Sequence, residues 1–525
     1  MNRTRKLAFS WTGTALVLAI LAAVNVAAHF VYGRLDFSAG RIYTLSSGTK
    51  NILDQLKDDM VVKVYYSPHL PAPYGPNGFY IHDLLEEYRS ASHGRMKLEF
   101  IDPDSSEKAK QEAEDAGVEP VQINVLSKDQ FSVKQIFMGA VFLYQGKAAV
   151  IPVFQDMSNL EYDLSQRINK LTQAKTKTLG FVTGHGEKSP TDPAVAPIFQ
   201  SVSDEATLRT VSLDKPIDPK FDALWILGPR DAYKPAEIER LKAWVNSGRP
   251  LGIMIDRSNV NIQSFQASPI STGLSALLAT WGANVSQNFV ADQQAEKIQL
   301  QARMGMFILP VIRDYPFIPV VNHIDDKSPI TRGIEVLTFP FVHAVVFKSP
   351  EGSGLAYESL ADSTPNSWLE PGYFINPDLN AAQLPKGHAG PFSLAGLITG
   401  DFSKAAPSSA QAVAGEPNRA APGQVLVVGT SYQLDSQLSD KASNQAFILN
   451  LLDWSMQNKN LLSIRAKAVS YRPLRAFPTA ERELLKYFLV FFPTLLLIVI
   501  AFFVYRRQKL VRRFLPLAYG EPQNA

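Results

Sequence analysis

Two long apolar runs without a formal charge lie near the ends of the chain. The first extends from Leu7 to Tyr32, and the second, which contains Pro493, extends from Tyr487 to Tyr505. Each run is long enough to cross a bilayer core of about 30 Å as a helix. A cleaved signal peptide is the alternative for the first run, but the apolar region of such a peptide covers only about 7–15 residues. We therefore predict two transmembrane helices.

Between these runs, the first pattern alternates strand-like and helical segments. The strand-like runs VVKVYY and MKLEFID alternate with the helical runs FYIHDLLEEYRSA and SSEKAKQEAEDAG, and the strands VQINVL, GAVFLY and KAAVIPV follow. A closing helix begins near Ser158 and Glu161, which have the spacing of a capping box. This order predicts a thioredoxin-like α/β domain. The apolar face of the closing helix consists of Leu160, Leu164, Ile168 and Leu171.

A second α/β pattern begins at TLGFVTG and continues with the strands ALWILGP and PLGIMID. The helix between the last two strands has Pro235 near its start and Gly248 as its stop, so the segment predicts a βαβ unit of a parallel sheet. Its order is similar to glutamine-amidotransferase-like, Rossmann-like α/β folds. The apolar positions of this helix are Ile238, Leu241, Trp244 and Val245.

The rest of this pattern predicts further strands at VLTFPFVHAVVF, PFSLAGLITG and QVLVVGTSYQL, and a helix at NQAFILNLLDWSMQ. The segment from Asp401 to Gly423 is rich in Ala, Pro and Ser, which predicts a flexible loop or linker rather than core. The predicted α/β organisation is a cytoplasmic N-terminus (1–6), a first span (7–32), a thioredoxin-like domain (33–175), an amidotransferase-like domain (176–460), a connector (461–486), a second span (487–505) and a basic cytoplasmic tail (506–525).

Basic residues flank both spans on their terminus-facing sides. By the positive-inside rule both termini are cytoplasmic, and the large middle part lies outside, in the periplasm of a Gram-negative cell. The net charge is +3, and the basic ends leave the middle part at −4, which argues against nucleic-acid binding. The flanking residues are Arg3, Arg5, Lys6, Arg506, Arg507, Lys509, Arg512 and Arg513.

Two residue patterns are missing from the sequence, and each excludes a function class. The chain has no cysteine, so it forms no disulfide and performs no thiol redox chemistry, even if the thioredoxin-like fold is present. The sequence also has no GxxxxGK[ST] phosphate loop, so this motif does not mark the chain as an ATPase. We predict no cofactor.

The stretch TGHGE places Gly184, His185, Gly186 and Glu187 directly after a predicted buried strand. Ligands gather at the carboxyl ends of parallel strands, so the loop is a candidate ligand-binding site, and an ordinary tight turn is the alternative. Catalysis by the histidine and glutamate needs a nucleophile. Ser431 is conceivable, but its surroundings, GTSYQ, lack a GxSxG elbow. We therefore predict no catalytic residue.

His323, Asp325 and Asp326 in NHIDDKSP offer imidazole and oxygen ligands for a divalent cation. Ligands so close in sequence more often form a solvated turn before a proline, here Pro329. We predict no metal site.

The chain contains several landmarks in a fixed order: RLDFSAGRIYTLSSGTKNIL after the first span, SPHLP, EEYRSASHGRMKLEFIDPD, TGHGE, NHIDDKSPITRGI, VLVVGTSYQLD, NQAFILNLLDW and a predicted terminal membrane helix with a basic tail. In this order they resemble the Gldg family, the gliding-motility-type auxiliary components of ABC transporters. The resemblance covers nearly the whole chain. It implies a non-enzymatic accessory subunit of the inner membrane that works with an ABC permease and a separate ATPase.

Two segments are candidates for the contact with such a permease. Asn25 and His29 share one face of the first span, where polar side chains are costly unless they face protein or water. The motif after the span offers Asp36 and Arg41, an expected ion pair, and Tyr43 and Leu45, which we expect to be buried (all in RLDFSAGRIYTLS).

Two other functions stay open from the sequence. One is a membrane-anchored envelope hydrolase centred on His185 and Glu187, and the other is a scaffold that binds a glycan or peptide independently of any transporter.

Overall fold

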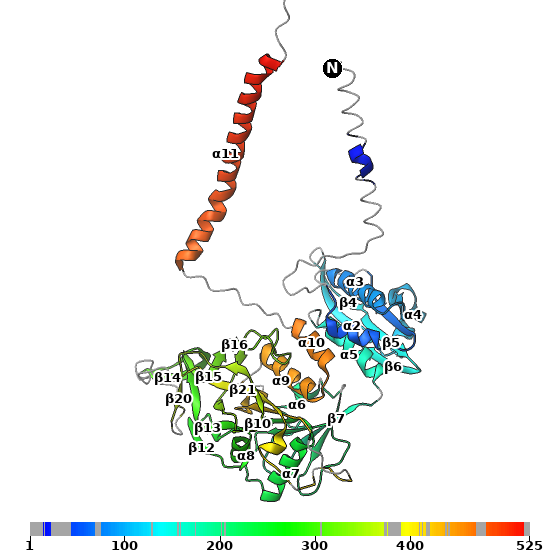
Figure 1. Cartoon of the computed structure of the whole chain (residues 1–525). Coiled ribbons are helices and arrows are strands. Elements are labelled where there is room, and N and C mark those ends of the chain that lie inside the picture. The colour runs from blue at the N-terminus through cyan, green and yellow to red at the C-terminus, as the bar shows by residue number, and fades with distance from the viewer. Residues whose placement is uncertain are drawn as a thin grey trace, which may run out of the picture. The chain divides into compact units, whose positions relative to one another are not determined.

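Figure 1 shows the computed structural model of the chain. Its contacts divide the chain into two units, Met1–Tyr471 and Arg472–Ala525, which are described separately. The structure describes residues 14, 16–20, 22, 44–68, 75–127, 130–154, 157, 159–173, 175–200, 202–203, 206–304, 307–371, 375, 390–408, 410–411, 413–415, 421–435, 438, 441–468 and 479–518.

The N-terminal α/β region, residues 44–173, is built on a mixed sheet with the order β2-β1-β5-β6. The strand β1 pairs parallel with β2 and antiparallel with β5, which confirms the alternating pattern read from the sequence. A separate antiparallel hairpin, β3 with β4, stands beside this sheet, and the sequence pattern did not predict β4. The elements are α2 (Ser47–Asp54), β1 (Met60–Tyr66), α3 (Gly75–Ala91), β2 (Met96–Ile101), η1 (Pro103–Ser105), α4 (Glu107–Asp115), β3 (Val121–Ser127), β4 (Gln130–Ile136), β5 (Met138–Tyr144), β6 (Lys147–Ile151) and α5 (Leu160–Thr172).

The closing helix α5 buries its predicted apolar face. Its N-cap is Asn159, which makes no side-chain cap hydrogen bond, and Ser158 of the predicted capping box lies outside the described residues. The Glu161 carboxylate accepts hydrogen bonds from the Ser46 backbone N–H and the Thr49 hydroxyl, both at 2.7 Å. These bonds connect α5 to α2. The buried leucine and isoleucine positions are Leu160, Leu164, Ile168 and Leu171.

The central α/β region, residues 175–458, is built on a larger sheet with the order β16-β19-β21-β22-β10-β9-β7-β8. The strands from β22 to β8 run parallel, and β21, β19 and β16 continue the sheet antiparallel. Helices α6 and α9 pack on one face, and α7 and α8 pack on the other. Successive strand residues alternate between the two faces, so both are apolar.

The chain reverses its direction of travel through the sheet between β7 and β9. From β7 it passes through α6 to the edge strand β8, and from β9 it passes through α7 to β10. Because α6 and α7 lie on opposite faces, the loops after β7 and β9 diverge at a topological switch point, the usual ligand site of such sheets. The elements up to α8 are β7 (Lys177–Val182), α6 (Ala196–Gln200), β8 (Ala206–Val211), β9 (Ala223–Leu227), α7 (Pro235–Asn246), β10 (Leu251–Met254), β11 (Ser258–Asn261), β12 (Gln266–Pro269) and α8 (Leu274–Thr280).

Shorter sheets and a long hairpin, β14 with β15, surround one end of the central sheet (Figure 1). Apart from the run VLTFPFVHAVVF, which supplies β17 and β18, the sequence pattern did not predict them. The remaining elements are β13 (Ala283–Asp292), β14 (Ala295–Met304), β15 (Phe307–Val321), β16 (His323–Ile324), β17 (Leu337–Thr338), β18 (His343–Phe347), β19 (Ala356–Asp362), β20 (Ser367–Glu370), β21 (Ser393–Gly400), η3 (Phe402–Lys404), β22 (Gly423–Val428), η4 (Tyr432–Leu434) and α9 (Ala442–Ser455).

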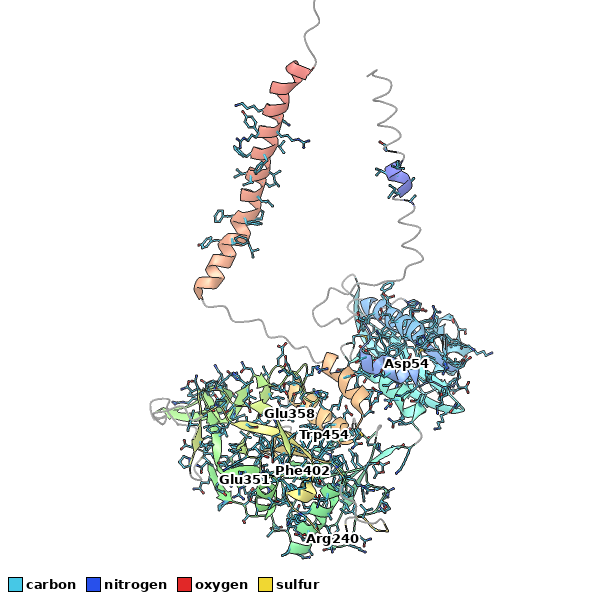
Figure 2. The ribbon with its side chains drawn as sticks, viewed as in Figure 1. Asp54, Arg240, Glu351, Glu358, Phe402 and Trp454 are labelled. Carbon is cyan, nitrogen blue, oxygen red and sulfur yellow. The ribbon has the colours of Figure 1, made fainter. Side chains whose placement is uncertain are left out.

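Two segment predictions in this region need correction. The run VLTFPFVHAVVF forms two short strands, β17 and β18, in different sheets, because Phe341 takes a positive φ of 51° between them. The segment Asp401–Gly423 is not a free linker. Phe402, labelled in Figure 2, is fully buried against Trp281, and Val413 is 3% exposed in the same core.

Two helices follow the central region, α10 (Lys459–Ala468) and α11 (Thr479–Ala518). The predicted connector, residues 461–486, therefore begins inside a packed helix. Among the described residues one helix, α11, is long and apolar enough to cross a membrane, over Lys486–Lys509, and it contains the predicted second span. Most of the predicted first span lies outside the described residues, and residues 16–20 of it are helical.

Candidate functional site

Four loops meet at the carboxyl edge of the central sheet, after the parallel strands β7, β9, β10 and β22. Each loop begins where its buried strand ends, so polar side chains next to the strand ends are brought together from distant parts of the sequence. Two connected sets of polar residues lie there. We name them the histidine network and the aspartate network.

The histidine network is built on the loop after β7, where Gly184 and Gly186 take φ angles of 121° and 74°. His185 is 8% exposed and stacks on the Tyr233 ring, with ring centroids 4.0 Å apart. Its Nε2 lies 3.0 Å from Glu237 Oε2, at the start of α7. Its Nδ1 is 3.5 Å from the nearer Glu187 oxygen, which is too long for a good hydrogen bond.

Both carboxylates of the histidine network are engaged inside the protein. Glu187 accepts from the His185 backbone N–H at 2.7 Å and from the Tyr233 hydroxyl at 2.5 Å. Glu237 accepts from the Lys234 backbone N–H, which caps α7. Burial, together with the neighbouring Glu187 charge, raises the pKa of Tyr233, so its hydroxyl stays a donor. The motif therefore connects the β7 loop to the first turn of α7.

The aspartate network centres on Asp256, which follows β10 and is 1% exposed. Its carboxylate accepts from the backbone N–H and the hydroxyl of Ser431, both at 2.6 Å, and lies 3.1 Å from the Arg230 guanidinium. Gly228 permits this approach, because a Cβ there would lie 2.2 Å from Ser431 Oγ. Ser431 is fully buried with its hydroxyl donated to Asp256, so it is not an available nucleophile.

Two cations cover the outer side of the aspartate network. The Lys188 ammonium lies 5.2 Å, and the Arg230 guanidinium 5.5 Å, from the centroid of the Tyr432 ring. Lys188 also donates to the Ser431 carbonyl at 3.0 Å. Burial lowers the pKa of Lys188, and the nearby Asp256 opposes this change. The Arg230 side chain is 26% exposed, and its Nη1 has no hydrogen-bond partner.

His343 lies beneath this edge and is fully buried. It stacks on Phe289 at 4.7 Å, and its Nδ1 is 3.2 Å from the Asn288 carbonyl. Burial lowers its pKa to about 4, although the nearby Asp256 charge opposes this change. The ring is therefore neutral at pH 7, and its Nδ1–H donates to the carbonyl.

The predicted site residues have different positions in the structure. The GHGE loop is at the carboxyl edge as expected, with its polar side chains engaged internally. Leu45 is 6% exposed in the core of the N-terminal α/β region, so its side chain is occupied within the chain. The other predicted partner residues, Asn25, His29, Asp36, Arg41 and Tyr43, lie outside the described residues.

The NHIDDKSP segment forms a turn. Asp325 accepts from the Lys327 backbone N–H through its side chain and from the Thr331 hydroxyl through its carbonyl. The Asp326 carbonyl accepts from Arg332. Within the described ranges, no group of His, Cys, Asp and Glu side chains is arranged to hold a metal ion.

Sequence reasoning missed Arg230, Asp256 and the role of Tyr432 at this edge. A signal was available, because each residue lies near the end of a predicted strand: Arg230 follows ALWILGP, Asp256 is the last residue of PLGIMID and Tyr432 is near the end of QVLVVGTSYQL. Applying the carboxyl-end rule to every parallel strand, and not only to the one before GHGE, would have found them.

The fold and its carboxyl-edge loops define an α/β protein with an apolar terminal helix, and the comparisons give its family. The chain belongs to the auxiliary family described as "ABC-type uncharacterized transport system", whose model matches residues 176–463. A domain of unknown function matches residues 39–143. An uncharacterized protein of Borreliella burgdorferi is 25% identical over 362 residues, which are 67% of this chain and 69% of the relative.

Two solved structures have a partial likeness. The mmIFT52 N-terminal domain is 13% identical, covers 53% of this chain and 96% of its own, and has a TM-score of 0.34. The exo-beta-1,4-mannosidase Op5Man5 from Opitutaceae bacterium strain TAV5 is 11% identical, covers 76% and 50%, and has a TM-score of 0.24. Scores this low add nothing to the argument about fold or function.

Proposed function

We propose that this protein is a non-enzymatic, membrane-anchored auxiliary subunit that works with an ABC permease and a separate ATPase. The family match over residues 176–463 carries this proposal. The apolar surface of α11 supports it, since the side chains described from Lys486 to Lys509 are exposed and suit a lipid environment. Arg506, Arg507 and Lys509 follow the span, so the C-terminus is cytoplasmic and the α/β regions are exterior.

We further propose that the two regions are thioredoxin-like and amidotransferase-like domains without the chemistry of those names. The exterior part binds the transported molecule or an envelope partner at the carboxyl edge of the central sheet. Lys188 and Arg230 are the residues we assign to this contact, because they are partly exposed there. The GHGE loop supports the edge, since His185 and Glu187 are already engaged with Tyr233 and Glu237.

Purification of the full chain from its native membrane at native expression tests the partnership. We expect the permease and ATPase to copurify. Recovery of this protein alone, with no permease captured by crosslinking, would contradict the proposal and favour a free-standing scaffold. Replacing Asn25 and His29 with leucine should preserve insertion but weaken copurification.

Reporter fusions test the topology. A reporter after Ala525 should lie in the cytoplasm, and one inserted at the exposed Glu351–Gly352 turn, where Figure 2 labels Glu351, should lie outside. Both reporters on one side of the membrane would contradict the two-span topology. The turn is a better insertion site than Asp401–Gly423, because Phe402 and Val413 in that segment are core residues.

A hydrolase assay tests the non-enzymatic assignment. The full chain should show no hydrolytic activity on envelope glycans or peptides that depends on the motif. An activity that is lost in both His185→Ala and Glu187→Ala, with folding intact in each, would establish the hydrolase alternative.

A further inference from the structure

The helix α10 belongs to two hydrophobic cores at once. Leu461 and Ile464, each 1% exposed, complete the core of the N-terminal α/β region, although about 300 residues separate them from the rest of it. Leu462, 2% exposed, packs into the core of the central α/β region. Adjacent helical residues point about 100° apart, so α10 buries two faces against two different partners.

The first of these partners includes α2, which α10 approaches very closely. A Cβ at Gly48 of α2 would lie 2.2 Å from the Asn460 carbonyl oxygen and 2.3 Å from Ser463 Oγ. No other residue fits there without moving one of the helices. Beside this contact, Asn51 Nδ2 donates to Asn460 Oδ1 at 3.3 Å.

The other side of α2 is fixed to α5. The Glu161 carboxylate receives the Ser46 backbone N–H and the Thr49 hydroxyl, and Ser165 lies 3.0 Å from Thr49 and 2.7 Å from the Tyr88 hydroxyl. These groups are buried or partly buried, so separating them from one another would leave polar atoms unpaired. The helix α2 therefore moves with the N-terminal α/β region, and the surface between α2 and α10 is the less interlocked side.

The packing is interrupted where α10 begins. The turn from α9 to α10 places Gln457 at a positive φ of 57°. A small polar cavity of about 20 Å³, enough for roughly one water molecule, lies between this turn and α5. Its lining includes Gln166, Asn169 and Asn458.

We propose that the α2–α10 contact is the joint through which movement at the membrane reaches both exterior α/β regions. Residues 33–46 lead from the predicted first span into α2, and residues 469–478 lead from α10 to α11. Both connections to the membrane thus enter the exterior part at one helix pair. Packed helices make small sliding movements of the shear type, and the contacting groups of α2 and α10 described here are a glycine and small polar side chains.

A substitution at Gly48 tests the contact in the purified full chain and needs no partner. Alanine is a better helix former than glycine, so by propensity Gly48→Ala should stabilise α2. The close contact predicts the opposite, a fall in Tm of about 3 °C or more. The control Lys50→Ala, at an exposed position of the same helix, should change Tm by about 1 °C or less. An unchanged or higher Tm for Gly48→Ala overturns the proposal.

Cysteine pairs test the movement, since the chain contains no cysteine of its own. The pair Asn51→Cys with Asn460→Cys spans the joint. The control pair Leu143→Cys with Ala148→Cys lies within one region, at exposed positions that face each other across β5 and β6. In membranes holding the complete transporter, trapping with ATP and vanadate should change the oxidation rate of the first pair at least threefold and leave the second unchanged. Equal rates for the joint pair in every nucleotide state overturn the proposal.

The test with cysteine pairs rests on the proposed function. Purification from the same membranes shows whether the proposed function or the joint has failed. If no permease or ATPase copurifies, the proposed function fails, and the Gly48→Ala result in the purified chain then tests only the close α2–α10 packing. If they copurify and the joint pair does not respond to nucleotide, the joint fails and the proposed function stands.

Discussion

The histidine network and the aspartate network lie at the same edge of the central sheet and differ in how far their charged side chains are exposed to solvent. The first contains the conspicuous motif GHGE, yet its carboxylates are engaged by Tyr233, by backbone N–H groups and by the His185 ring. The second has no recognisable motif, yet its Arg230 and Lys188 side chains are partly exposed. A recognisable sequence motif can thus have a structural role, while residues without a motif at neighbouring strand ends keep contact with solvent.

Removing the buried charge at the centre of the aspartate network should have the largest effect on stability. Asp256→Ala leaves two Ser431 donors unpaired and removes the counter-charge of Arg230, so we expect the free energy of unfolding to fall by about 3 kcal/mol. Denaturation of the full chain followed by tryptophan fluorescence measures this. Asp256→Asn, which keeps an acceptor, should cost less. Equal costs for both variants would show that charge, and not hydrogen bonding, holds this edge.

The pH dependence of the free energy of unfolding should report on the buried His343. Its folded pKa of about 4 lies below the unfolded value of 6.5, so the unfolded chain binds the extra proton between these values. The His343 contribution should therefore raise stability as pH rises from about 4 to 6.5, by on the order of 3 kcal/mol, and level off above. In His343→Gln this part of the slope should disappear, and a slope identical to that of the unmodified protein would contradict the assignment.

The histidine network should respond to mutation as a structural unit. Glu187→Ala removes acceptors from the His185 backbone N–H and the Tyr233 hydroxyl, so we expect a loss of about 2 kcal/mol. Tyr233→Phe deletes only one of these bonds and should cost about 1 kcal/mol. If both variants unfold like the unmodified protein but lose complementation of a deletion strain, the network has a functional role that its buried contacts do not indicate.

The smallest effect on stability is expected where the edge is most exposed. Lys188→Gln should change the free energy of unfolding by about 1 kcal/mol or less, because Lys188 retains solvent contact. Arg230→Lys keeps a positive charge beside the buried Asp256 and should cost similarly little. Both variants should nevertheless reduce complementation of a deletion strain while copurification with the permease persists. Full complementation by the double variant would remove the proposed ligand contact from this edge.

Local sequence patterns predicted the elements that have a clear apolar periodicity or clear boundary residues. The alternating β1 and β2 strands, the α7 helix between Pro235 and Gly248, and the parallel β7, β9 and β10 strands were all predicted. The prediction failed where distant partners decide the outcome. Phe402 lies in an Ala- and Pro-rich segment but enters the core, and the run VLTFPFVHAVVF divides between two sheets. Composition cannot show which surface a segment will meet.

The sequence by itself determined the absence of thiol chemistry, the apolar length of the terminal helix and the order of the α/β elements that have a clear local pattern, because these depend on residue type and short-range periodicity. The tertiary structure decided which polar residues meet. Strand ends from four parts of the chain form the carboxyl edge, and α10 returns to complete a core that begins at Leu45. Such contacts depend on long-range packing between segments. The need for a glycine at position 48 is visible only in the structure, where α10 lies too close for a Cβ.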